Sequence, residues 1–204
     1  ATRSASFLPV GSLGSTEETT KTIGWHQDLD KAKKLLAEAG FPDGFEFEVH
    51  YGTGVVAGTS YHVLGQKVQS DLARVGIKLK VTPMPQVNVR TLYNGGKVSS
   101  VITYWNPPAA ENALWAWATV QRVARRLHWK PPEELVKLVD AAAIEPDQVK
   151  QAELYIQYQK AMVDEANLLV LFQPIYKIGA RRTLKELPLT AAGWQLDIRD
   201  VKPA

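Results

Sequence analysis

The sequence predicts an α/β fold in which helices flank a mixed β-sheet. Apolar and polar residues alternate with the two-residue period of a strand over residues 45–51 and again over 77–81. Between these segments, apolar residues recur at helical spacing over residues 61–75, and Gly76 ends that helix. Because strand, helix and strand follow in order, a right-handed crossover makes the two strands parallel.

The composition is that of a globular protein. Hydrophobic residues make up 45% and charged residues 22% of the 204 residues, and no apolar run approaches the roughly 20 residues of a membrane-spanning helix. The absence of cysteine excludes disulfides, thiolate metal sites and cysteine nucleophiles. A net charge of +3 is too small to indicate nucleic-acid binding. Residues 1–22 do not read as a secretory signal, so any export signal is expected upstream of this chain.

The first elements follow from local signals. Residues 1–27 are rich in Ser, Thr and Gly and lack a hydrophobic period, so we expect an extended connector that packs on a part of the protein outside this chain. Asp28 has the position of a helix N-cap, and the apolar stripe that follows it ends at Gly40. Residues 41–44 have the composition of a turn and lead into the first strand.

The second half of the chain is expected to be mainly helical. The predicted elements are a short helix at 86–94, a third strand at 98–104, helices at 111–126, 133–143 and 146–166, a short buried strand at 168–172 and a final strand at 194–198. Pro146 suits the first helical position, where its missing N–H costs nothing.

Four blocks of the chain carry a more specific pattern. They are residues 28–45, which end in Ala39-Gly40-Phe41-Pro42-Asp43-Gly44-Phe45; residues 69–77, with Asp71-Leu72 and Gly76-Ile77; the strand-end pair Tyr104-Trp105; and residues 145–176. In this order, over about residues 28 to 200, the chain resembles the family 5 extracellular solute-binding proteins, which serve peptide, nickel and related importers.

The resemblance implies the C-terminal lobe of a two-lobed periplasmic-binding-protein type II fold, whose ligand is enclosed between the lobes by hinge closure. Residues 1–27 would be the connector from an N-terminal lobe outside this chain, 28–184 the α/β lobe, and 185–204 the return segment toward the other lobe. The implied function is solute capture for an ABC importer, so we expect neither enzymatic activity nor a cofactor. The implied partners are a small solute, an ABC permease and the N-terminal lobe, with no nucleic acid. The implied location is the periplasm, or the extracellular side with a lipid anchor.

The residues expected to line the cleft are Tyr51, Thr53, Tyr104, Trp105 and Asn106. Binding crevices of open α/β sheets lie beyond the carboxyl ends of the strands, which is where Tyr51 and Thr53 fall. Trp105 is the residue expected to stack on the ligand, although a structural role suits it nearly as well.

The sequence departs from the family where the ligand is chosen. Peptide-binding members carry an Asp three residues after the strand-end Trp, and some carry an Arg three residues before it, whereas this chain has Pro108 and Ile102. Because a buried ammonium without a carboxylate is costly, ordinary peptides are disfavoured. The solute is expected to be peptide-like, opine-like or sugar-like, held by aromatic faces and neutral hydrogen bonds.

Alternative readings remain open. The segment Gly52–Gly58 lies between a strand and a helix and has the outline of a dinucleotide-binding turn, which would indicate a nucleotide-using enzyme domain. The next strand, however, does not end in the acidic residue that such a site needs. An interaction module that binds no small molecule is a third reading.

Other conspicuous residues favour structural roles. Trp115 and Trp117 are two apart on one predicted helix, so core packing explains at most one of them. The four histidines show no metal-binding spacing, and no serine lies in a nucleophile elbow. A basic cluster is interpreted as a solvated helix face, with phosphate or nucleic-acid binding as the less favoured reading; it comprises Arg122, Arg125, Arg126 and Lys130.

Overall fold

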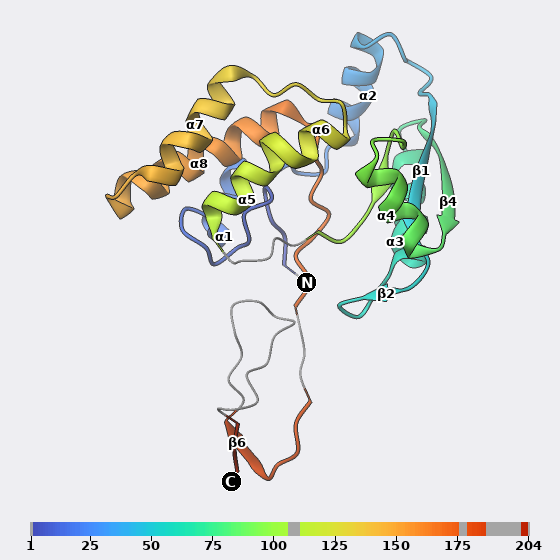
Figure 1. The fold of residues 1–204 in the computed structure, drawn as a ribbon. Coiled ribbons are helices and arrows are strands. Elements are labelled where there is room, and N and C mark those ends of the chain that lie inside the picture. Colours follow the sequence, from blue (N-terminus) through green and yellow to red (C-terminus); the bar gives the residue numbers. More distant parts are fainter. Residues whose placement is uncertain (1, 106–110, 176–178, 187–200, 204) are drawn as a thin grey trace.

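The computed structural model describes residues 2–105, 111–175, 179–186 and 201–203. Two bodies lie side by side (Figure 1). The sheet body comprises β1, β4 and β5 with α3 and α4, and the helical body comprises α1, α5, η1, α6, α7 and α8. The helix α2 leads into the sheet body, and the pair β6 and β7 projects away from both bodies. The α/β class expected from the sequence is confirmed.

The helices and strands have the following bounds. In chain order they are α1 (Glu17–Ile23), α2 (Leu29–Glu38), β1 (Glu46–Gly52), β2 (Val55–Val56), β3 (Thr59–Ser60), α3 (Tyr61–Ala73), β4 (Lys78–Met84), α4 (Gln86–Asn94), β5 (Val101–Ile102), α5 (Asn112–Ala118), the π-helical turn η1 (Thr119–Val123), α6 (Ala124–Arg126), α7 (Glu133–Ile144), α8 (Gln148–Glu165), β6 (Leu184–Glu186) and β7 (Lys202–Pro203). No helix of the described part is long and apolar enough to cross a membrane.

The sheet has the strand order β4-β1-β5. The two strands that flank α3 pair in parallel from Glu46 opposite Lys78 to Gly52 opposite Met84, as the crossover rule predicts. The third strand is shorter than the predicted 98–104, because only β5 pairs with β1, also in parallel. The sequence predicted a mixed sheet; in its described part this sheet is parallel, and the antiparallel pairs belong to the small β2-β3 and β6-β7 ribbons.

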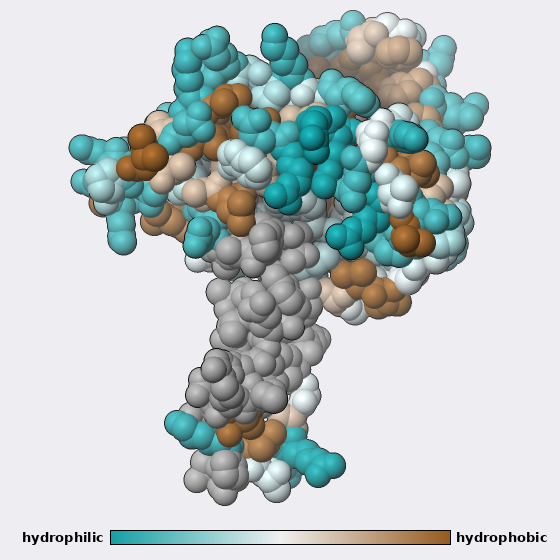
Figure 2. Space-filling view, viewed as in Figure 1, coloured by the Kyte–Doolittle hydropathy of each residue, from teal (hydrophilic) through white to brown (hydrophobic). Residues whose placement is uncertain are grey.

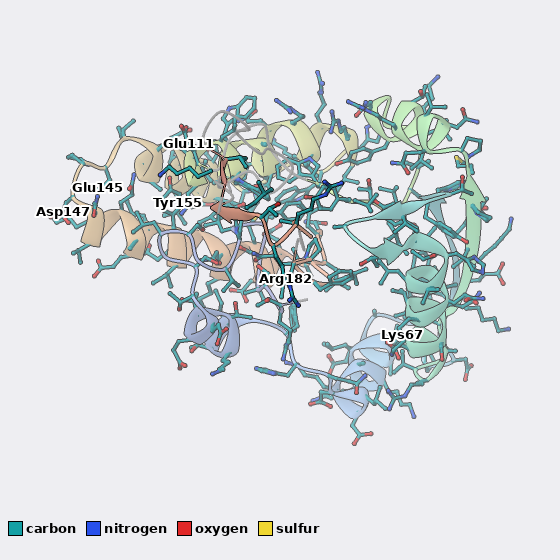
Figure 3. All side chains as sticks on the ribbon, turned by 90° about the horizontal axis from the view of Figure 1, so that it is seen from below. Lys67, Glu111, Glu145, Asp147, Tyr155 and Arg182 are labelled. Carbon is teal, nitrogen blue, oxygen red and sulfur yellow. The ribbon has the colours of Figure 1, made fainter. Side chains whose placement is uncertain are left out.

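The two crossover helices cover opposite faces of the sheet. The chain moves one way from β1 to β4 and the other way from β4 to β5, so right-handed connections place α3 and α4 on different sides. Figure 3 shows the sheet between them. The face toward α3 carries the apolar residues of the predicted alternation, and the core there consists of Val49, Tyr51, Tyr61, Leu79 and Ile102. The periodicity therefore predicted the buried face correctly.

The helical body has its own core, with buried polar groups beside the apolar ones. The apolar core consists of Leu8, Ala116, Val120, Leu135, Val139, Ala142, Tyr155, Tyr158 and Met162. Gln159 is fully buried, donates to the carbonyl of Gly14 at 2.7 Å and accepts from the Ser6 hydroxyl at 3.2 Å. Burial raises the pKa of Tyr158, whose hydroxyl lies 2.6 Å from that of Thr119. These partners satisfy groups whose burial would otherwise be costly.

The N-terminal segment is part of the helical body, which corrects the expectation that residues 1–27 are irregular. It forms α1, with the Thr16 hydroxyl accepting from the Thr19 N–H, and it buries Leu8 completely. Sequence period could not show this, because the segment buries single apolar and small polar side chains against α8 rather than a regular stripe.

Three further predicted elements differ in part from those in the structure. The predicted helix 111–126 is one helical stretch with the π-helical turn η1 in its middle. The long helix begins at Gln148 with Asp147 as its N-cap, so Pro146 precedes the cap. The buried strand expected at 168–172 is wrong: no strand is assigned there, and Leu169 is 69% exposed. Apolar composition alone gave that prediction, and no neighbouring strand pairs with the run.

The remaining predictions concern α2 and the C-terminal end. Asp28 caps α2 by accepting from the Lys31 N–H at 2.9 Å, as predicted. The apolar stripe of this helix is not packed in a core, however: no residue of α2 is buried, and Leu35 is 50% exposed. The final strand expected at 194–198 lies outside the described residues.

Candidate functional site

The carboxyl ends of the parallel strands meet at one edge of the sheet. Gly52 at the end of β1 lies opposite Met84 at the end of β4, and Ile102 at the end of β5 lies opposite Tyr51. We call this the carboxyl edge. In open α/β sheets this edge borders the binding crevice, so the location of each predicted site residue relative to it decides what that residue can contact.

Thr53 lies at the carboxyl edge and is exposed. Its backbone N–H donates to the carbonyl of Met84 at 2.9 Å, which continues the pairing of β1 and β4 by one residue. The backbone is thereby fixed while the residue stays exposed, and its hydroxyl can donate and accept hydrogen bonds.

Tyr51 lies in the core of the sheet body, with 1% of its surface exposed. Its hydroxyl lies 2.8 Å from Nδ1 of His62 on the first turn of α3. Its ring passes so close to α3 that a Cβ at Gly65 would lie 3.4 Å from it. In this structure Tyr51 has almost no surface to offer a ligand, and it holds the edge in place from beneath.

Tyr104 and Trp105 follow β5 and connect the two bodies. Tyr104 is half-buried against the core of the sheet body, and its N–H donates to the Tyr61 hydroxyl at 2.6 Å. Trp105 turns to the helical body, where its ring makes edge-to-face contacts with Phe7 and Trp115, each at a centroid distance of 5.2 Å. Trp105 itself is half-buried, so part of its ring remains accessible. Asn106 lies outside the described residues.

Sequence reasoning missed the aromatic neighbours that position Trp105. Phe7 lies in the segment interpreted as a connector, and no periodic signal marks it. Trp115 packs against the helical core, whereas Trp117 is 43% exposed, so one of the two tryptophans packs inward as the spacing predicted. The indole N–H of Trp115 is buried and has no hydrogen-bond partner among the described residues.

The segment Gly52–Gly58 does not form a nucleotide-binding turn. Its residues form the hairpin β2-β3, whose two central turn residues, Ala57 and Gly58, have φ values of 50° and 77°. Positive φ at both positions is the geometry of a tight hairpin turn. The glycines therefore shape a projecting hairpin and do not bring backbone N–H groups to a phosphate at the start of α3, so the alternative reading is not supported.

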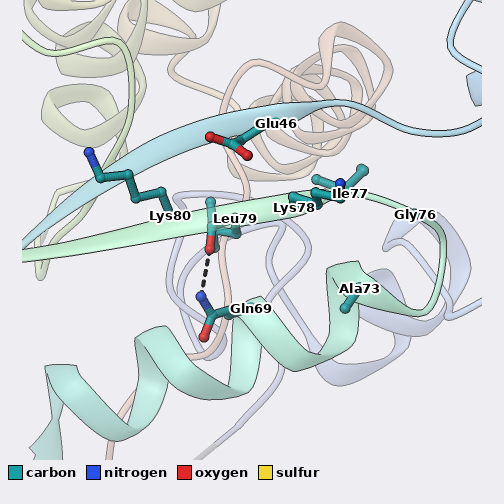
Figure 4. A pocket seen from close by; sticks show the side chains of 8 residues that line it. All are labelled: Glu46, Gln69, Ala73, Gly76, Ile77, Lys78, Leu79 and Lys80. Carbon is teal, nitrogen blue, oxygen red and sulfur yellow. Dashed lines mark hydrogen bonds between the residues drawn. The ribbon is translucent and has the colours of Figure 1, made fainter.

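Two cavities lie elsewhere on the described surface. The larger, about 570 Å³, is an open groove along the outer edge of β4 (Figure 4), and its lining includes Gly76, Lys78 and Lys80. There Gln69 donates to the carbonyl of Leu79 at 2.6 Å, which occupies one acceptor of an otherwise open strand edge. A smaller one, about 180 Å³, lies between Arg3 and residues 168–171. Neither is lined by Thr53, Tyr104 or Trp105.

The polar face of the sheet carries a charged cluster. The Thr82 hydroxyl donates to Glu48, and Lys80 lies 3.3 Å from the same carboxylate; these contacts lower the pKa of Glu48. His50 is half-buried, with Nε2 3.9 Å from Glu48. No group of three or more possible metal ligands occurs within the described ranges. The cluster therefore resembles a set of sheet-surface ion pairs.

Comparisons with known proteins agree on one family. Residues 1–124 match the family described as bacterial extracellular solute-binding proteins, family 5 middle. The dipeptide-binding protein of Escherichia coli K12 is 27% identical over 164 residues, which cover 74% of this chain and 30% of that protein. The glutathione-binding protein GsiB of Salmonella paratyphi A is 30% identical over 129 residues, covering 60% of this chain and 24% of that protein.

Solved structures share the fold. The dipeptide binding protein from Pseudoalteromonas sp. SM9913, in complex with Met-Leu, superimposes with a TM-score of 0.66 at 17% identity, over 87% of this chain and 36% of that one. The binding protein MoaA from A. tumefaciens R10, in complex with mannopinic acid, gives a TM-score of 0.62 at 24% identity, over 79% of this chain and 32% of that one. The chain thus spans between 24% and 36% of the length of these four proteins.

Proposed function

Because the chain belongs to the bacterial extracellular solute-binding proteins of family 5, we propose that it forms one wall of an inter-lobe cleft that captures a small solute for an ABC importer. In this proposal residues 28–184 are the C-terminal lobe, residues 1–27 the crossing from an opposite lobe, and residues 185–204 the return segment. Solute stabilises the closed form, which an ABC permease recognises. The action is capture and release, with no bond made or broken, on the periplasmic or extracellular side of a membrane, where a lipid anchor is one means of retention.

The observation that carries the proposal is the placement of Trp105. It follows the end of a parallel strand, at the edge where crevices form in this class of sheet. Two edge-to-face contacts fix the ring, yet it stays partly accessible. A fixed, accessible indole is suited to stack on a ligand, because little conformational entropy is lost when the ligand binds. Thr53 and Asn106 would add neutral hydrogen bonds beside it.

The proposed solute class rests on the names of the relatives and on the position where this sequence differs from peptide-binding members of the family. Relatives named for dipeptides and glutathione favour a peptide-like solute, and the structure solved with mannopinic acid adds an opine. Position 108 is Pro, so the chain lacks a carboxylate there to hold a free ammonium. We propose a peptide-derived or opine-like solute whose amine is not held at this position, with a sugar-like solute as the alternative.

A titration followed by NMR of the indole N–H signals tests this proposal. A single wall leaves the ligand open on one side, so we expect millimolar Kd values for the 204-residue chain with a dipeptide, glutathione or mannopinic acid. The Trp105 signal should shift with at least one of them. Trp105→Ala should weaken that binding by about tenfold, the size of a lost aromatic contact. The matched variant Trp117→Ala should leave it unchanged.

Two outcomes would contradict the proposal. One is that none of the three probes moves the Trp105 signal at tens of millimolar, roughly tenfold above the Kd that we expect. The other is that NAD or ATP binds with micromolar Kd, which would favour the nucleotide-using enzyme domain.

A further inference from the structure

Charge is divided unevenly along the chain. Residues 72–132 contain nine Lys or Arg residues and one acidic residue, Glu111, a net charge of +8. The whole chain carries +3, so the remaining residues carry −5. A molecule with such separated charge has a strong field over one region and is oriented by a charged surface that it approaches.

Folding gathers much of this charge where α4 meets α6. Nε2 of His128, just after α6, lies 2.8 Å from the carbonyl of Gly96, just after α4, and the Arg126 guanidinium lies 4.9 Å from the centre of the Tyr93 ring. We call the basic residues in and just beyond α4, η1 and α6 the basic patch. They are Arg90, Lys97, Arg122, Arg125, Arg126 and Lys130. In Figure 2 strongly hydrophilic residues gather over the same part of the molecule.

Within the described ranges, no acidic side chain forms an ion pair with the basic patch. Every ion pair found among the described residues involves other cations, namely Lys34, His50, Lys67, Lys80 and Lys137. Arg125 and Arg126 follow Arg122 by three and four residues, a spacing at which like charges on a helix repel and are destabilising. The Nε of Arg126 is buried without a hydrogen-bond partner in the described part of the chain. An anion bound from outside would offset the repulsion among these like charges.

An exposed aromatic residue borders the basic patch. Trp117 is 43% exposed, and the Arg122 guanidinium lies 5.7 Å from the centre of its ring. Trp117 and Arg122 are brought together by the π-helical turn η1, a rare conformation that is frequent at functional sites. Tryptophan beside basic residues is typical of surfaces that lie at the headgroup level of a membrane.

We propose that the basic patch binds an anionic membrane surface through lipid phosphate groups, with Trp117 at the headgroup level. A leaflet that contains anionic lipids presents a continuous negative potential, which suits a patch of a single sign, whereas protein surfaces mostly intersperse both signs. The acidic residues Glu145 and Asp147 lie at the end of the helical body far from the sheet body (Figure 3), so they would be held away from the membrane. This orientation does not depend on which solute binds.

Vesicle co-sedimentation tests the proposal with two variants of the 204-residue chain. The patch variant replaces Arg122, Arg125 and Lys130 by Gln. The control variant replaces Lys31, Lys33 and Lys34 of α2 by Gln, so each variant removes three positive charges. We expect the chain to sediment with phosphatidylcholine vesicles that contain phosphatidylglycerol and not with pure phosphatidylcholine. The patch variant should bind about 100-fold more weakly, because each basic residue near an anionic leaflet contributes about fivefold. The control should bind within about twofold of the unaltered chain.

Thermal unfolding of both variants establishes that they fold, and the double variant Arg125→Gln, Lys130→Gln replaces the triple one if its Tm falls. Equal losses for the patch variant and the control would overturn the proposal, because net charge would then suffice. Binding to soluble polyglutamate but not to phosphatidylglycerol vesicles would also overturn it and would indicate an acidic protein partner. A blue shift of tryptophan emission on vesicles, lost in Trp117→Phe, would support the placement of that ring.

Discussion

The helical body and the sheet body differ in how completely they bury their cores. None of the nine core residues of the helical body is more than 3% exposed, and its buried Gln159 and Thr119 are hydrogen-bonded. The core of the sheet body has five residues, and Ile102 is 9% exposed. A sheet of three described strands, one of them just two residues long, with an open groove along β4 is the thinner structure. The comparison indicates that the helical body is the rigid support and that the sheet body presents the carboxyl edge.

The largest expected effect comes from truncating one buried leucine in each body. Leu135 and Leu79 are similarly buried, at 3% and 4% exposure, but Leu79 lines the groove along β4. We expect Leu135→Ala to lower the free energy of unfolding by about 4 kcal/mol and Leu79→Ala by about 2 kcal/mol, because an open site relaxes more easily around the cavity. Urea unfolding measures both, and an equal or reversed order would contradict the difference between the bodies.

The polar network of the helical body provides the second test. Gln159→Leu leaves the Gly14 carbonyl and the Ser6 hydroxyl without their partner, so we expect a loss of about 2 kcal/mol in the free energy of unfolding. Gln157→Leu, on the exposed face of the same helix, should change it by less than about 0.5 kcal/mol. Should both variants unfold at the same urea concentration, the N-terminal segment would not be an integral part of the helical body.

The smallest expected effect is on how the unfolding free energy depends on acidic pH through Glu48 in the sheet body. The Thr82 hydroxyl and Lys80 hold the pKa of Glu48 below its usual value. A lowered carboxyl pKa contributes stability that is present above the unfolded-state pKa, about 4.3, and is lost as the pH falls through the folded-state pKa. We therefore expect Thr82→Val to narrow the difference in unfolding free energy between about pH 7 and about pH 3. Thr91→Val, whose hydroxyl meets only a backbone carbonyl, should leave that difference unchanged.

The same contrast explains which parts of the fold were predictable. The β1-α3-β4 unit follows from two short periodic patterns and a glycine stop, all within 40 residues, and the parallel direction of its two strands was predicted correctly. The N-terminal segment was not, because Leu8 and Ser6 reach their partners on α8 about 150 residues later in the chain. Local period carries no information about such contacts.

The carboxyl edge was predictable from the sequence, whereas the tertiary contacts of the candidate residues near it were not. The predicted parallel direction of the strands indicated the carboxyl edge, and Thr53 and Trp105 lie there or next to it. Alternation along β1 puts Tyr51 on the same face as Val49, which is the face that α3 covers, so the pattern that predicted the strand also accounts for its burial. Phe7, which fixes Trp105, could come only from the tertiary structure.

The most direct test of the carboxyl edge as the solute-contacting surface is a backbone amide chemical-shift map of the 204-residue chain with whichever probe solute binds. We expect the amide signals of Gly52, Thr53 and residues 103–105 to shift, while those of the β4 groove, residues 76–80, stay in place. Shifts confined to the groove, with the carboxyl edge unchanged, would contradict it.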